Sequence, residues 1–160
     1  MSPLLLKDFL LSSAFLLGFE SAPIDFSEEK VMVGIWGTES SLFLYILVFS
    51  TFFVFALPMF LVPLRWAAVL GWEIPAQGNL SIYYGRCLAS VMSVLCYMGF
   101  VAAGNRAVQP FYFNILLGCF GLMVIVHAYG GIRRIQPLSE TIETGFWLIL
   151  FFCGLFFYPI

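Results

Sequence analysis

Two side chains that can carry charge stand inside long apolar stretches of this sequence, Arg86 and His127, and His127 is the only histidine. The short segment 105–109 joins these two stretches, so helices over them are expected to be antiparallel neighbours. Positions equidistant from that turn then lie at equal depth, and the midpoint between residues 86 and 127 falls inside it. We therefore predict that Arg86 and His127 share one polar layer, a turn or two inside one membrane interface.

Five more polar side chains are expected at or near this layer. They are Tyr83, Tyr84 and Tyr129 from the same two helices, and Glu140 and Glu143 from the connection that follows. An unpaired charge or imidazole in hydrocarbon costs several kcal/mol, so these groups are expected to find partners. The simplest interpretation is a structural clamp, in which Arg86 pairs with Glu140 or Glu143. His127 then hydrogen-bonds a tyrosine or a backbone carbonyl.

Three other roles are open for the layer. Arginine, histidine and tyrosine together suit the phosphate or carboxylate of a lipid headgroup or small ligand whose tail lies between helices. His127 alone could be the axial ligand of a haem or a chlorophyll, although a bis-histidine haem needs a second histidine. Catalysis has the least support, because no nucleophile and base occur at a recognisable spacing. The chain is therefore predicted not to be an enzyme.

The cysteines do not indicate a metal or redox centre. None belongs to a CxxC pair, and none has a histidine at metal-ligand spacing. Free cysteines in apolar runs usually pack as small apolar side chains, as we expect of Cys87, Cys96, Cys119 and Cys153. No metal site is predicted and no cofactor is required, while bound lipids are expected and contact with haem, chlorophyll or carotenoid stays open.

The elements that position these groups follow from the composition. Of the 160 residues, 62% are hydrophobic and 10% are charged, and these fractions are typical of a protein embedded in a bilayer. The formal net charge of -2 leaves no basic surplus for a phosphate backbone, which excludes nucleic acid as a partner. We predict an all-α integral membrane protein, with membrane lipids and other membrane-protein subunits as its partners.

Four apolar runs approach the roughly 20 residues that a spanning helix needs. They predict transmembrane helices over about 41–63, 82–104, 109–131 and 144–160, which together form a four-helix transmembrane domain over residues 41–160. Pro58, near the end of the first run, predicts a kink there.

Residues 1–40 form a separate N-terminal region. The apolar run 3–19 carries Lys7 and Asp8 side by side, and we expect either a membrane-embedded helix packed against the bundle or a short fifth span. The acidic connector over 20–40 is either a solvated linker or a docking surface for another subunit. The apolar anchors of such a surface would be Val31, Val33, Ile35 and Trp36.

Four spans place the loops 64–81 and 131–143 on the same side of the membrane. These loops carry Arg65, Arg133 and Arg134, and basic loop residues concentrate on the cytoplasmic side of membrane proteins. We therefore predict an inner or cytoplasmic membrane, or the organellar equivalent, with both loops on the cytoplasmic side.

The function has a lead hypothesis and an alternative. Small size, the lack of a soluble domain and the lack of a catalytic set favour a non-catalytic accessory subunit of a larger membrane complex of the energy-transducing kind, respiratory or photosynthetic. The 19 phenylalanines fit contact with lipids, neighbouring subunits or isoprenoid molecules. The alternative is a stand-alone lipid- or isoprenoid-binding bundle that uses the Arg86 and His127 layer. A transporter is disfavoured, because it would need charged or broken helices near the midplane.

Overall fold

The computed structural model describes residues 33–160, and every regular element in this part of the chain is helical. The predicted helix over 3–19, most of the acidic connector and Val31 lie outside the described residues. The elements are η1 (Gly37–Glu39), α2 (Ser40–Thr51), the π-helical segment η2 (Phe52–Ala56), α3 (Leu57–Leu61), α4 (Pro63–Val69), α5 (Asn79–Ala103), α6 (Gln109–Arg133) and α7 (Leu138–Phe156).

Four helical stretches are long and apolar enough to cross a bilayer, as the sequence predicted. They are the composite helix Gly37–Leu61, α5, α6 and α7. The largest difference is at the last span, which begins at Leu138 rather than near residue 144. Glu140 lies in the first turn of α7, where an acidic side chain interacts favourably with the helix dipole. The two glutamates are therefore part of the helix and not of the loop before it.

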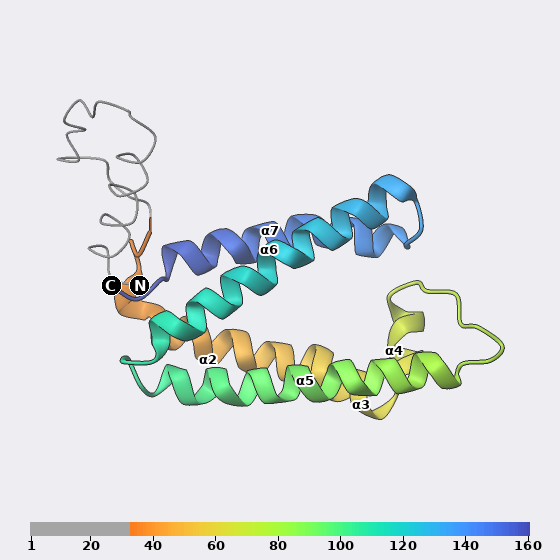
Figure 1. Cartoon of the computed structure of the whole chain (residues 1–160), viewed down its shortest axis with the longest axis horizontal. Coiled ribbons are helices and arrows are strands. Elements are labelled where there is room, and N and C mark those ends of the chain that lie inside the picture. Colours follow the sequence, from red (N-terminus) through yellow and green to blue (C-terminus); the bar gives the residue numbers. More distant parts are fainter. Residues whose placement is uncertain (1–32) are drawn as a thin grey trace, which may run out of the picture. The chain divides into compact units, whose positions relative to one another are not determined.

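The helices pair as two hairpins. Figure 1 shows α5 lying along α2 and α3, and α6 lying along α7. Although α5 and α6 are consecutive and joined only by residues 104–108, they contact each other little along their length. The expectation that α5 and α6 pack as close neighbours therefore holds only near their turn.

The hydrophobic core lies near that turn, where α2, α5 and α6 meet. Its buried members are Leu44, Ala102, Ala103, Tyr112 and Phe113, with Phe43, Leu116, Phe157 and Tyr158 packed around them. Burying such large aromatic and aliphatic side chains is favourable by about 1.5–3 kcal/mol each in water, and in a bilayer the gain comes from close packing instead.

A buried amide joins the same three helices. Gln109 is completely buried and accepts a hydrogen bond of 2.7 Å from the Ser40 hydroxyl through its Oε1. Its Nε2 donates to the Ser41 hydroxyl at 2.8 Å and to the Ala103 carbonyl at 3.3 Å. Because these groups are out of reach of water, their mutual pairing is what makes their burial tolerable.

The first span is interrupted near its far end, where Pro58 predicted a kink. The π-helical segment η2 comes directly before the short helix α3 that contains Pro58. Val62 then leaves the helical conformation, with φ −135° and ψ 55°, and α4 starts at Pro63. Both prolines lack the N–H that would continue a helical ladder, so each removes one backbone hydrogen-bond donor from this stretch.

Candidate functional site

His127 is buried in α6, with 5% of its surface exposed. Its Nδ1 lies 2.8 Å from the carbonyl oxygen of Met123, one turn earlier in the helix. A carbonyl can only accept, so Nδ1 carries the proton in this contact. The bond to a backbone carbonyl is one of the partners expected from the sequence. It leaves Nε2 as the ring atom that faces the rest of the site.

Two carboxylates from α7 meet this nitrogen. The Nε2 atom of His127 lies 3.1 Å from Oε2 of Glu140 and 3.7 Å from Oε2 of Glu143. Glu140 and Glu143 are three residues apart on one helix, and this spacing places both on the same face. The exposed fractions of the three side chains are 7%, 13% and 20%, so the cluster is largely shielded. We call these three residues the His–Glu cluster.

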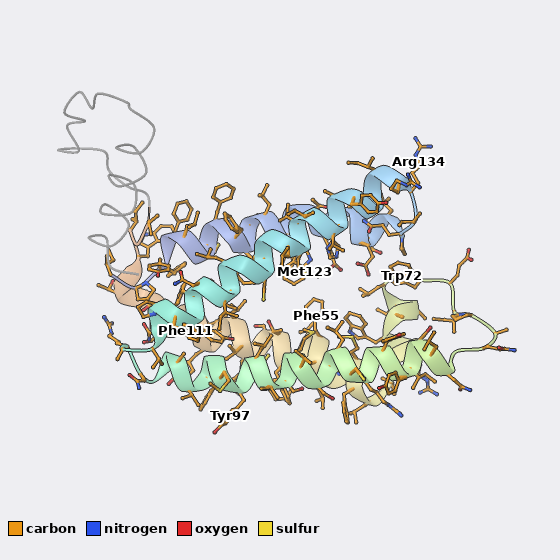
Figure 2. The ribbon with its side chains drawn as sticks, viewed as in Figure 1. Phe55, Trp72, Tyr97, Phe111, Met123 and Arg134 are labelled. Carbon is orange, nitrogen blue, oxygen red and sulfur yellow. The ribbon has the colours of Figure 1, made fainter. Side chains whose placement is uncertain are left out.

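The loop between α4 and α5 closes over the cluster. The indole N–H of Trp72 donates to Oε1 of Glu140 at 2.7 Å, and the Ser139 hydroxyl bonds to the Leu70 carbonyl. Figure 2 shows Trp72 pointing from its loop toward the α6–α7 hairpin. The two loops that were expected to share one side of the membrane therefore touch each other at this end of the bundle.

Aromatic and amide groups complete the surroundings. The Trp147 ring packs against the His127 ring, with centroids 5.9 Å apart. Its buried indole N–H lies near the Glu143 carboxylate but forms no hydrogen bond of good geometry within residues 33–160. The Gln136 amide donates to the His127 backbone carbonyl at 2.9 Å and to the Thr141 hydroxyl at 3.2 Å.

Arg86 lies elsewhere. Its Nε donates to the carbonyl of Phe60 at 3.3 Å, and among the described residues it forms no ion pair with Glu140 or Glu143. The proposed clamp between Arg86 and these glutamates is therefore not formed. Equal distance from the turn does not set the direction in which Arg86 points, and α5 packs along the first span while α6 packs along α7. Arg86 thus binds a carbonyl near the C-terminal end of α3, where the helix dipole favours a cation.

The three tyrosines of the predicted layer face outward. Tyr83, Tyr84 and Tyr129 are each about 60% exposed, and the rings of Tyr83 and Tyr84 contact each other at 5.8 Å. Tyrosines in such positions are common where a helix crosses the membrane interface. The predicted layer is therefore divided into the buried His–Glu cluster, the separate Arg86 and outward tyrosines.

Arg86 shares a surface hollow with Arg65, which the sequence analysis had not connected with it. The hollow has a volume of about 400 Å³, and its lining is Leu61, Val62, Pro63, Leu64, Arg65, Ile82 and Arg86. The break at Val62 turns α4 so that Arg65 comes to the side of α5 that holds Arg86. A second, almost entirely apolar hollow of about 360 Å³ is lined by Phe52, Leu57, Phe60, Ser90 and Ser93. Ser90 is one helical turn deeper than Arg86 on α5.

The predicted docking anchors are partly engaged within the chain. The Trp36 ring packs against Phe156 and Phe157, with ring centroids 5.7 and 5.3 Å away. The backbone N–H of Trp36 donates to the Phe156 carbonyl. Half of its surface is still exposed, as are 60% of Ile35 and 37% of Val33. The segment therefore covers the end of α7 while keeping an apolar outer face, and its docking role stays a prediction.

The haem or chlorophyll role of His127 stays a prediction as well. Both ring nitrogens already have partners, so axial ligation would require Nε2 to leave the two carboxylates.

Comparison of the chain with protein-family models, with curated proteins and with solved structures finds no match.

Proposed function

We propose that the protein is a non-catalytic accessory subunit of a larger integral membrane complex. The observation that carries this proposal is how little of each span is covered by the rest of residues 33–160. In the most apolar window of each helix, 28% of α5 is buried but only 6% of α7, which within this part of the chain has α6 as its one extensive neighbour. The surface that remains must be covered by lipid or by other helices.

Outward-facing small residues favour other helices for part of that surface. In the described part of the chain, a side chain added at Gly118 of α6 or at Gly145 of α7 would meet nothing within 4 Å. Lipid chains do not need glycine, whereas small residues let a second helix approach closely enough for good packing. Asn114 is exposed one turn before Gly118, and its Oδ1 accepts a hydrogen bond from the Tyr158 hydroxyl at 3.2 Å. Its amide N–H groups are the part of the side chain that a neighbouring helix could pair with.

The test is whether the chain stays with a larger complex. Native membranes dissolved in a mild detergent should yield the chain in a band far heavier than its own 18.0 kDa. The Gly118→Leu and Gly145→Leu variants should shift it to its own mass while the isolated chain keeps its thermal stability. Val126→Leu, which adds bulk at another exposed position of α6, is the matched control and should stay in the band. Absorption by haem or pigment in the visible spectrum of that band would support the further proposal that the complex is energy-transducing. Migration of the unaltered chain alone, with lipid only, would overturn the proposal.

A second candidate function, anionic-lipid binding, is favoured by the two adjoining hollows. Arg65 and Arg86 supply two guanidinium groups for a phosphate at the interface, and the apolar hollow one turn deeper suits an acyl chain. In nanodiscs, phosphatidylglycerol should raise the melting temperature of the wild type relative to phosphatidylcholine. The Arg65→Gln, Arg86→Gln double variant should lose this increase, and Arg133→Gln should keep it. An equal response of all three proteins would count against a lipid site in the hollow.

A further inference from the structure

We propose that His127, Glu140 and Glu143 bind a divalent transition-metal ion, with Zn²⁺ as the probe. Their ligand atoms all lie within 4.8 Å of one another. Zinc bonds to imidazole nitrogen and carboxylate oxygen are about 2.0–2.2 Å long, so ligand atoms around one ion are about 3.0–3.5 Å apart. The 3.1 Å from Nε2 to Oε2 of Glu140 lies at this spacing. Oε2 of Glu143 is 3.7 Å from Nε2 and the separations within the group reach up to 4.8 Å, so binding one ion requires the Glu143 carboxylate to move closer to the other two ligands.

The protonation of the His127 ring independently points to a cation in the cluster. Nδ1 donates to the Met123 carbonyl, so in the neutral ring Nε2 presents a lone pair to Oε2 of Glu140 and of Glu143. Three acceptors facing one another repel unless a proton or a metal ion lies between them. A histidine that binds a metal through one nitrogen usually donates the other N–H to a carbonyl or carboxylate, which is the arrangement here.

Hydrogen-bond donors around the His–Glu cluster orient its ligand atoms, as they do around metal ions. Trp72 donates to Oε1 of Glu140, so the other oxygen of that carboxylate is turned toward His127. Hydrogen bonds to ligating carboxylates fix their orientation and raise metal affinity. The Trp147 ring packs against the His127 ring, and its buried indole N–H lies near the Glu143 carboxylate one turn earlier on α7, so it is a second donor that orients a ligand.

Charge balance favours a divalent ion over a single proton. The described residues place no lysine or arginine within ion-pair distance of Glu140 or Glu143. One proton on the ring leaves the cluster with a net charge of −1. A divalent ion with neutral His127 makes it neutral, as would a second proton on one of the two carboxylates. Burying an uncompensated charge is costly, and a bound ion is often the largest local charge in such a site. One imidazole and two carboxylates suit Zn²⁺, Fe²⁺ or Mn²⁺.

Titration of the purified full chain in detergent tests the proposal. After treatment with a chelator, isothermal titration with Zn²⁺ should show one ion bound per chain, and Co²⁺ should give visible bands of a nitrogen and oxygen site. His127→Gln should abolish binding, and Glu143→Gln should weaken it at least tenfold. Trp72→Phe should weaken binding about tenfold, since loss of an outer partner typically costs 10- to 100-fold.

The control is Glu73→Gln, which removes an exposed carboxylate next to Trp72 in sequence and should leave binding unchanged. Helical circular dichroism of each variant shows whether it is folded. If His127→Gln does not fold, the Co²⁺ spectrum of the wild type and the Glu143→Gln titration decide. Absence of stoichiometric binding by the wild type would overturn the proposal, and NMR showing a doubly protonated His127 ring would assign the cluster to a proton instead. Equal weakening by Glu73→Gln and Glu143→Gln would also overturn it.

Discussion

The indole N–H of Trp66 donates a hydrogen bond of 3.0 Å to the carbonyl oxygen of Val54. Val54 is four residues before Pro58, and its carbonyl would accept the helical hydrogen bond that the proline nitrogen cannot donate. In hydrocarbon a free carbonyl is costly, and proline is tolerated in spanning helices where a neighbouring group replaces the lost donor. Trp66 thus explains how an interrupted first span remains compatible with a membrane.

Trp66→Phe should therefore destabilise the protein by about 1 kcal/mol, because the ring still packs on Phe55 while the donor is lost. Equilibrium unfolding in mixed micelles measures this change. In a Pro58→Ala background residue 58 has its own N–H, so the same substitution should cost clearly less. Equal costs in both backgrounds would contradict the link between Trp66 and the proline.

The buried amide near the α5–α6 turn gives a second prediction. Ser40→Ala should lower the free energy of unfolding by about 1–2 kcal/mol, because Oε1 of the buried Gln109 loses its donor. Ser90 is the matched control. Its hydroxyl bonds only back to the Arg86 carbonyl on the exposed side of α5, so Ser90→Ala should change stability by less than about 0.5 kcal/mol. A Ser40→Ala cost no larger than that of the control would show that the Gln109 contacts do not contribute.

The membrane topology can be tested by labelling. In a cysteine-free background, cysteines at the exposed positions Ala76 and Ile135 should react with a membrane-impermeant maleimide from the same side, and a cysteine at Ala107 from the opposite side. One span separates residue 107 from residue 135, and two separate residue 76 from residue 135. Inside-out vesicles should label residues 76 and 135, because the arginine-bearing loops are predicted to be cytoplasmic. Labelling of all three from one side would exclude four spans.

Arg86→Leu separates the two roles that were first assigned to one layer. Arg86 donates to the Phe60 carbonyl and not to the glutamates, so the substitution should cost less than about 1 kcal/mol in neutral detergent. Zn²⁺ affinity should not change. A decrease in affinity as large as that of Glu143→Gln would mean that Arg86 faces the His–Glu cluster in solution.

The four spans could be predicted because a bilayer imposes a minimum length of apolar sequence, and the runs meet it. The common depth of Arg86 and His127 stays a prediction, because α5 and α6 contact each other little beyond their turn. Direction around each helix could not be predicted. Arg86 and His127 point to different partners because α5 lies along the first span and α6 along α7, and nearly uniform apolar faces give no signal for that choice.

Part of the His–Glu cluster could be predicted from the positions of its residues along the chain. Glu140 and Glu143 were expected near His127, because the next connection begins just beyond it. Trp72 was not expected there, since it comes from an irregular loop with no periodicity to orient it. Arg65 joins Arg86 only because the chain turns at Val62, and Pro63 was the one signal in the sequence that could have indicated such a turn.

The burial of Gln109 has a consequence for the way in which the chain enters a membrane. The partners of its side chain, Ser40, Ser41 and Ala103, belong to α2 and α5, which a ribosome delivers before α6. Before α6 is inserted, the Ser40 hydroxyl lacks Gln109 as its acceptor and the hydrophobic core lacks Phe113. We therefore expect the described helices to reach their final packing only once α6 has been inserted. A nascent chain that stops before residue 109 should stay bound to the insertion machinery, whereas one that extends through α6 should be released into the lipid.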